Sequence, residues 1–451
     1  MPNQTFPNNV PTLNHRLMAL YGLPHLTHSM VLLPLVLFIP SYYADDLALP
    51  LASVGMAIAI SRLLDVFTDP IMGILSDRWH TRWGRRKPWL VLGTPLLVLS
   101  TWMVFVPGGK VSVVYLFIWT SLLFLSFDIF DLPYKAWGAE LSTDYKERSR
   151  VAAWREAFGA SGHIFFLLIL MVMGFLGYHG NREQLLVIAL IICICLPLFV
   201  ALAVSKVPER PPEQLNGPSH LGWSGMKLVF RNQAFIRTLI ALVLFGTGLV
   251  IQATLHKMVL KHIVGRSELF SSMILAETFT SLVVLPAWVW LSDRIGKHRA
   301  LTFAGAWVGL WGLALPLVGH GDIELYVTLI VFRGSSLAAI IFLSNSIAAD
   351  VIDHDTVASG HQRTGFYFSL WGMAIKMAIG LGVFLGTTLP SLYGFEPSAA
   401  SHSGATEFAL MRIYGWLPCS IMLLAFPLLW NYPITREKQQ ELRAQIEARR
   451  K

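Results

Sequence analysis

The stretch LASVGMAIAISRLLDVFTDPIMGILSDRWHTRWGRRK, residues 51–87, contains the pattern that decides the fold. Residues 51–76 are mostly apolar, and as a helix they are long enough to cross the roughly 30 Å hydrocarbon core of a bilayer. A basic cluster, GRRK at residues 84–87, follows closely. An apolar run that ends beside Lys and Arg predicts a membrane-spanning helix that meets the charged membrane surface at that end.

The rest of the chain repeats this pattern. It has 451 residues, of which 54% are hydrophobic and 14% are charged, whereas soluble domains contain about 25% charged residues. Helices are expected because strands cross a membrane only as shorter alternating segments of a closed barrel. The sequence therefore predicts an all-α membrane protein with twelve transmembrane helices. The predicted spans are 18–43, 51–76, 88–107, 111–137, 150–177, 185–206, 234–262, 268–291, 299–318, 323–349, 365–390 and 407–431.

Lys and Arg are distributed unevenly between the predicted loops. The net charge of +8 is compatible with nucleic-acid binding, but the basic residues gather in the terminal segments and in the loops on one side of the membrane. This bias places the basic loops and both termini in the cytoplasm, so we expect no nucleic-acid partner. The basic tail at 432–451 is expected to lie near anionic lipid of the bilayer. The basic loops are 76–89, 138–150, 204–233, 291–300 and 350–364.

A short internal repeat divides the chain into two halves. The sequence LSDR occurs at 75–78 and again at 291–294, each time at the end of the second predicted span of a half. Two parallel six-helix repeats with a substrate path between them are typical of the major facilitator superfamily, which the chain resembles over its full length. The expected units are a six-helix bundle at 1–206, a cytoplasmic linker at 207–233, a second six-helix bundle at 234–431 and a cytoplasmic tail at 432–451.

Charged residues at the predicted cytoplasmic helix ends are candidates for gates. Ion pairs near water form and break at modest cost, as a carrier that opens and closes requires. The second and eighth spans each end in an Asp-Arg pair, and two acids at the end of the tenth span are expected to pair with Arg148 or Arg150. The alternative is that these charges only set the membrane topology. The candidate gating residues are Asp77, Arg78, Asp293, Arg294, Asp350, Asp353 and Arg148.

A small set of ionisable residues lies inside the predicted spans. Each costs about 2.5–3.5 kcal/mol on insertion scales, so each is expected to have a partner or a function. Asp65 and Asp69 are four residues apart and share one helix face, with Arg62 one turn away. The full set is Arg62, Asp65, Asp69, Asp128, Asp131, Lys135, Glu277, Arg333 and Lys376.

Three segments make the family resemblance more specific. RLLDVFTDPIMG (62–73), FDLPYKAWGAEL (130–141) and DVIDHDTVASGHQRTGFYFSLWGMAIK (350–376) are similar to the glycoside–pentoside–hexuronide:cation symporters, the melibiose-carrier-like family of that superfamily. In this family the acids of the second helix bind the coupling cation. The resemblance therefore implies that Asp65 and Asp69 bind a cation, and would be the metal ligands if the cation is Na⁺.

The resemblance assigns two further helices to these sites. It implies that Asp131 contacts the solute and that Lys376 is the lysine of the eleventh helix, while Asp128 lies where the melibiose carrier has a hydroxyl at its cation site. Clustered carboxylates suit either Na⁺ coordination or a shared proton, and Lys376 can neutralise them when no cation is bound. The expected cation site is Asp65, Asp69, Asp128 and Lys376, the alternative being a purely structural ion-pair cluster.

The solute site departs from that of galactoside carriers. The first span contains YGLPHLTHS at 21–29, without the acid of those carriers, and Lys135 replaces an aromatic residue. A uronide, an acidic glycoside or another anion would suit Lys135, although this residue can instead pair with Asp131 or Asp128. Interhelical pairing or packing is the alternative for the other candidates. The candidate solute contacts are Asp131, Lys135, Trp371, Arg155, Arg333 and His28.

These residues predict a cation-coupled secondary active symporter of a sugar, glycoside or uronide, driven by Na⁺ or H⁺ and acting by alternating access. The alternative is a carrier of lysolipids or other amphiphiles or organic anions, which would need an apolar groove open to the bilayer instead of a closed polar cavity. An enzyme is not expected, since H-E-x-x-H and phosphate-loop motifs are missing from the sequence. We expect no cofactor, a bacterial inner-membrane location and function as a monomer.

Overall fold

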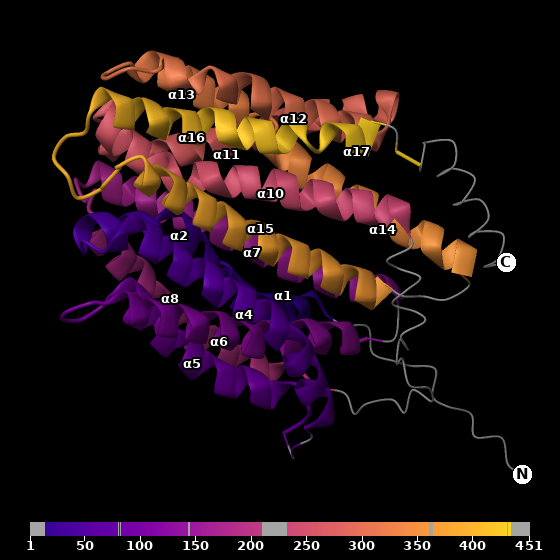
Figure 1. Cartoon of the computed structure of the whole chain (residues 1–451). Helices are drawn as coiled ribbons and strands as arrows, with labels where there is room; N and C mark the ends of the chain where they lie inside the picture. Colours follow the sequence, from indigo (N-terminus) through magenta and orange to yellow (C-terminus); the bar gives the residue numbers. More distant parts are fainter. Residues whose placement is uncertain are drawn as a thin grey trace, which may run out of the picture.

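The computed structural model describes residues 14–79, 81, 83–142, 145–209, 232–359, 364–430 and 432–433. Within these ranges the chain is helical, and twelve helices are long and apolar enough to cross a membrane (Figure 1). The predicted fold class is therefore confirmed. The predicted linker at 207–233 and tail at 432–451 lie mostly outside the described residues.

The first six spans are built from eight α-helices and a π-helical turn. They are α1 (His15–His28), α2 (Leu32–Leu37), α3 (Ile39–Ser41) with the turn Tyr42–Asp46, α4 (Leu51–Arg78), α5 (Lys87–Phe105), α6 (Val113–Glu140), α7 (Tyr145–Phe175) and α8 (Asn181–Lys206).

The last six spans follow in the same order. They are α10 (Gln233–Val259) with the π-helical turn Leu260–Val264, α11 (Phe270–Ile295) after a 3₁₀ turn at Ser267–Leu269, α12 (Lys297–Leu313) with the 3₁₀ turn Leu315–Leu317, α13 (Ile323–Gly334), α14 (Leu337–Ser359), α15 (Thr364–Leu392), α16 (Gly404–Leu423) and α17 (Phe426–Trp430).

The first and tenth spans are each interrupted, which the apolar pattern alone did not predict. In the first span, α1 ends at His28 and α2 begins at Leu32. Pro34 lacks the N–H that a continuous helix would donate to the carbonyl of Met30. In the tenth span the break falls at Ser335–Ser336, directly after Gly334, and small Gly and Ser residues are a common cause of helix kinks.

The helices gather in two groups. Figure 1 shows α4, α5, α6 and α8 on one side of the view and α12, α13, α16 and α17 on the other. Helix α15 lies between these groups and packs along α4. Gly55 of α4 faces Thr387 of α15 so closely that an added Cβ would overlap the Thr387 hydroxyl. Close approach at a small residue is how transmembrane helices gain packing energy without help from the hydrophobic effect.

A second contact between the first six and the last six spans lies at the end of the molecule remote from the start of α1. Lys261, just after α10, pairs with Asp45 at 2.6 Å. Nearby, the Lys257 ammonium lies 4.6 Å from the ring centre of Phe38, which packs edge-on against Phe270. These contacts join the first span to the seventh and eighth.

We predict that Gly55→Ala destabilises the protein, because the added methyl group pushes α4 away from α15. Overpacking of this kind costs about 1–3 kcal/mol. Gly73→Ala, on the same helix with open space around its Cα, is the matched control and should be neutral. Thermal unfolding in detergent measures both, and equal melting temperatures for the two variants would contradict the packing role of Gly55.

Candidate cation and solute sites

The centre of the molecule holds three carboxylates from two helices around one lysine from a third. Asp65 and Asp69 lie four residues apart in the middle of α4, and Asp128 lies in the middle of α6. Lys376 reaches them from α15. Its Nζ lies 3.0 Å from Asp65 Oδ2, 2.8 Å from Asp69 Oδ1 and 3.1 Å from both oxygens of Asp128.

A second cation supports this cluster from within α4. The Arg62 guanidinium donates to Asp65 Oδ2 at 2.8 Å and lies 4.3 Å from the ring centre of Phe124. Arg62, Asp65 and Asp128 are 4%, 2% and 3% exposed, so their charges are shielded from water. One oxygen of Asp65, Oδ1, is buried and has no hydrogen-bond partner among the described residues.

The charge balance of the cluster defines what it can bind. With all five groups ionised, the three carboxylates exceed Lys376 and Arg62 by one negative charge. One carboxylate oxygen from each of the three acids lies within 4.8 Å of the others. A net charge is costly in a membrane interior, and hard monovalent cations prefer oxygen ligands. The residues therefore fit one added Na⁺ or one added proton, and Lys376 occupies the position of a competing cation.

The predicted solute residues on α6 form a separate pair one turn from Asp128. Lys135 Nζ lies 2.6 Å from Asp131 Oδ2, so of the two acids considered as its partner Lys135 pairs with Asp131. The Lys135 side chain is 48% exposed, whereas Asp131 is buried. His28 of α1 lies beside this carboxylate, with its ring stacked 4.0 Å from that of Phe127.

The other three solute candidates have their own partners. Arg333 of α13 is buried and forms an ion pair with Glu277 of α11. Trp371 of α15 donates its indole N–H to Asn345 Oδ1 at 3.1 Å, and Arg155 of α7 pairs with the adjacent Glu156 at 2.5 Å. Across the described ranges, the hydrogen bonds and ion pairs of these residues do not connect them to Asp131 or Lys135. The interhelical pairing considered for Arg333 is thus present.

The candidate gating residues are only partly described. Asp350 pairs with Lys297 at 2.6 Å, and Arg148 Nε donates to the carbonyl of Ser142 at 2.6 Å. Arg294 lies over the ring of Trp290, and Asp293 is exposed at the end of α11. The side chains of Asp77, Arg78 and Asp353 lie outside the described residues, so their gating roles stay predictions.

The sequence reasoning missed two acids that contact the basic cluster at residues 84–87. Glu140, the last residue of α6, accepts from the guanidinium groups of Arg85 at 2.5 Å and Arg86 at 2.7 Å. Glu209 accepts from the backbone N–H groups of Arg85 and Arg86 at the start of α5. The basic cluster GRRK signalled that acids would be near, but the sequence did not show which distant acids would reach it.

Comparison with known proteins places this geometry in a family. Residues 20–436 match the family described as MFS/sugar transport protein, where MFS denotes the major facilitator superfamily. The chain belongs to this family. It is therefore a membrane-integral transporter and not an enzyme, as the sequence predicted.

Three relatives show what this chain is similar to. An uncharacterized symporter of Synechocystis sp. is 26% identical over 92% of this chain and 93% of that protein. The glucuronide carrier protein homolog of Escherichia coli is 23% identical over 97% of each chain. The sodium-dependent lysophosphatidylcholine symporter 1 of Homo sapiens is 23% identical over 88% of this chain and 79% of its own length.

A solved structure has the same fold. The bacterial homolog of the human lysosomal transporter Spinster, in an inward-facing and unoccupied conformation, aligns with a TM-score of 0.66. The alignment covers 95% of this chain and 100% of that chain at 13% sequence identity. At this identity the likeness concerns the arrangement of the helices.

We predict that Lys376→Met destabilises the protein, because three clustered carboxylates then have only Arg62 to offset them. Removing one partner of a buried ion pair costs about 3–5 kcal/mol. Adding Asp128→Asn to Lys376→Met should recover part of the loss, since it removes one of the repelling charges. Lys110→Met, at an exposed loop lysine, is the control. Thermal unfolding at low Na⁺ tests this, and unchanged stability of Lys376→Met would contradict it.

Proposed function

We propose that the protein is a secondary active symporter that couples one monovalent cation, Na⁺ or H⁺, to the transport of a sugar, glycoside or uronide. The observation that carries this proposal is the contact of Lys376 with Asp65, Asp69 and Asp128. This ion cluster joins α15 of the second half to α4 and α6 of the first. Its charge is balanced by the addition of one cation.

The cluster supports a coupling mechanism that needs no chemical reaction. A cation that binds the carboxylates competes with Lys376, which then no longer ties α15 to α4 and α6. Breaking that tie frees the two halves to move relative to one another, and rebinding of Lys376 resets the empty carrier. A differential interaction with two conformations is what any ligand needs in order to shift a conformational equilibrium.

The solute is proposed to bind beside the cation site, at Asp131 and Lys135. Asp131 lies three residues from Asp128 on α6, so both sites share one turn of helix. A carboxylate and an ammonium group together can bind sugar hydroxyls, and Lys135 can pair with the carboxylate of a uronide. The similarity to a glucuronide carrier homolog supports an acidic sugar.

The orientation is proposed from the charge distribution. Both termini and the basic loops lie in the cytoplasm of a bacterial inner-membrane protein that functions as a monomer. In this orientation the contact between Lys261 and Asp45 lies on the outer side. Two ion pairs then lie on the cytoplasmic side. Glu140 pairs with Arg85 within the first half, and Asp350 pairs with Lys297 within the second half.

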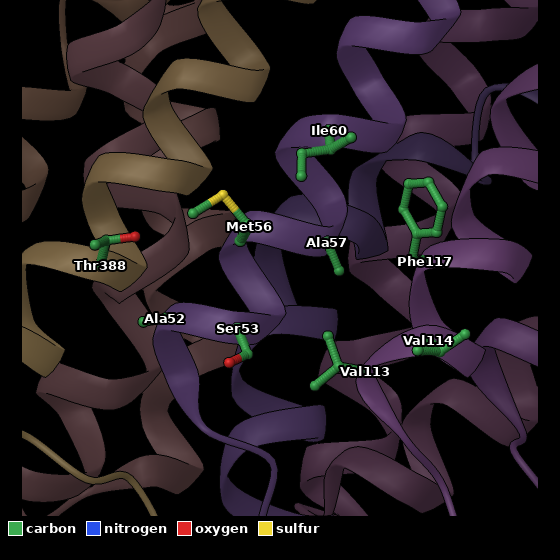
Figure 2. Close-up of a pocket in the computed structure, with 9 residues that line it drawn as sticks. All are labelled: Ala52, Ser53, Met56, Ala57, Ile60, Val113, Val114, Phe117 and Thr388. Atoms are coloured by element: carbon green, nitrogen blue, oxygen red, sulfur yellow. The ribbon is translucent and has the colours of Figure 1, made fainter.

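A lysolipid or another amphiphile is the second candidate solute, and a specific feature favours it. A cavity of about 420 Å³ lies between α4, α6 and α15, and its lining is almost entirely apolar. Figure 2 shows Met56 of α4 pointing toward Thr388 of α15, with Phe117 of α6 on the other side. Ile60 lines the cavity only five residues before Asp65. The similarity to a lysophosphatidylcholine symporter supports this candidate.

We predict that Asp69→Asn abolishes cation-driven accumulation but leaves exchange of solute across the membrane. Accumulation should fall at least about tenfold, as expected when a cation ligand is lost. Uptake is measured in proteoliposomes with an imposed Na⁺ or H⁺ gradient, over a panel of glycosides, uronides and lysolipids. The control is Asp322→Asn, which removes a carboxylate whose only described side-chain hydrogen bond is from the Gly319 N–H. Full gradient-driven accumulation by Asp69→Asn would refute the coupling assignment.

Two variants distinguish the solute classes. For a uronide carrier, Lys135→Gln should lower uptake of the uronide about tenfold or more, with less effect on the matching neutral glycoside, because only the uronide loses an ion pair. For an amphiphile carrier, Met56→Trp should fill the apolar cavity and lower lysolipid uptake instead. Uptake of radiolabelled solutes by both variants decides between them. An acidic sugar would be excluded if Lys135→Gln transported the uronide at the original rate.

A further inference from the structure

We propose that His25, His28 and Asp131 form a binding site for a transition metal ion of the Zn²⁺ class. His25 and His28 lie three residues apart in the last turn of α1 and face the same side of that helix. Asp131 comes from α6. One potential ligand atom from each of the three lies within 4.8 Å of the other two.

The strongest support is a buried histidine with unused nitrogens. His28 is 0% exposed, and neither of its ring nitrogens has a hydrogen-bond partner among the described residues. The same holds for Nδ1 of His25. Each buried polar atom left without a partner costs about 1–3 kcal/mol, so a persistent cluster of them points to a ligand. A metal ion would use one lone pair of each imidazole.

The surroundings hold these ligands in place. The His28 ring stacks on Phe127 and Phe130, with ring centres 4.0 Å and 4.7 Å away. The Tyr21 hydroxyl, one turn before His25, donates to the carbonyl of Tyr134 at 2.9 Å and so ties α1 to α6. The site also lies at the C-terminal end of α1, where the helix dipole favours a cation.

The donor set selects the class of metal. Imidazole nitrogen with a carboxylate suits Zn²⁺, Co²⁺, Ni²⁺ or Cu²⁺, whereas Mg²⁺ and Ca²⁺ prefer oxygen ligands alone. At present Lys135 places a positive charge against Asp131. Because the Lys135 side chain is 48% exposed, it can turn toward water when a metal ion takes its place. The cation site of Asp65, Asp69 and Asp128 has only oxygen donors and is a different site.

This inference goes beyond the proposed function, and only one consequence rests on that function. A metal ion bound to Asp131 would block the proposed solute contact, so Zn²⁺ would inhibit uptake. Binding itself is measured on the purified protein without any transport assay. A failure to bind metal would thus overturn this inference and leave the symport proposal untouched.

The test uses the full chain in detergent, with any affinity tag removed, titrated with Zn²⁺ by calorimetry and with Co²⁺ by visible absorption. The expected result is a site that Mg²⁺ does not fill, with affinity reduced at least about tenfold by His25→Ala, His28→Ala or Asp131→Asn. His298→Ala, at a buried histidine of α12, and Asp65→Asn are the controls and should retain the site. Equal affinity in the original protein and in His28→Ala would overturn the proposal.

A second test looks for a new absorption band instead of a loss of binding, so a variant that merely misfolds cannot give the expected result. In His28→Cys a thiolate replaces the imidazole, and bound Co²⁺ should then show the strong sulfur-to-metal absorption that the original site lacks. The native Cys193, Cys195 and Cys419 lie on other helices, α8 and α16, so they do not supply this band. Absence of the band at saturating Co²⁺ in a folded His28→Cys protein would contradict metal ligation at this position.

Discussion

The structure depends on one electrostatic constraint, the placement of the Lys376 ammonium among three carboxylates in the middle of the membrane. Neither sign of charge is stable alone at that depth, because burial removes the water that would solvate it. The lysine comes from α15 and the acids from α4 and α6, so mutual neutralisation requires the two groups of helices to meet. The remaining unit of negative charge is what would attract a cation to the proposed site.

Helix α6 connects this cluster to the proposed solute site. Asp128 pairs with a lysine from another helix, whereas Asp131, one turn on, pairs with Lys135 of its own helix. Under the proposed function, binding at one site would alter the charge next to a residue of the other site one helical turn away. The break in the first span, caused by Pro34, ends α1 beside Asp131 and places His25 and His28 there. The acids of the proposed cation, solute and metal sites therefore all lie on α4 and α6, while α1 supplies the histidines and α15 supplies Lys376.

The fold could be predicted from the sequence because spanning a membrane demands a long apolar helix, and each of the twelve spans is such a run. The position of Asp65 and Asp69 on one face of a helix could be predicted from their spacing of four residues. Their partner Lys376 lies 307 residues from Asp69, so the spacing of residues could not identify it and only the family resemblance did.

The partner of Lys135 could not be predicted from the sequence, because Asp128 and Asp131 share its helix face. The structure shows that Asp128 pairs with Lys376, and that Lys135 pairs with Asp131. Glu140 and Glu209 were missed because they are far in sequence from Arg85 and Arg86, and only the packing of the helices brings these residues into contact.

The most direct test of this account is the exposure of Lys376 to a small amine-reactive reagent, measured by mass spectrometry of the labelled peptide. If a cation replaces the ammonium at the carboxylates, labelling of Lys376 should rise as Na⁺ is added at constant pH and ionic strength, provided that Na⁺ is the coupling ion. For a proton-coupled carrier, Na⁺ should have no effect, and labelling corrected for the intrinsic pH dependence of Lys110 should rise as the pH falls. Labelling of Lys376 that responds to neither cation would contradict the claim that cation and lysine compete for Asp65, Asp69 and Asp128.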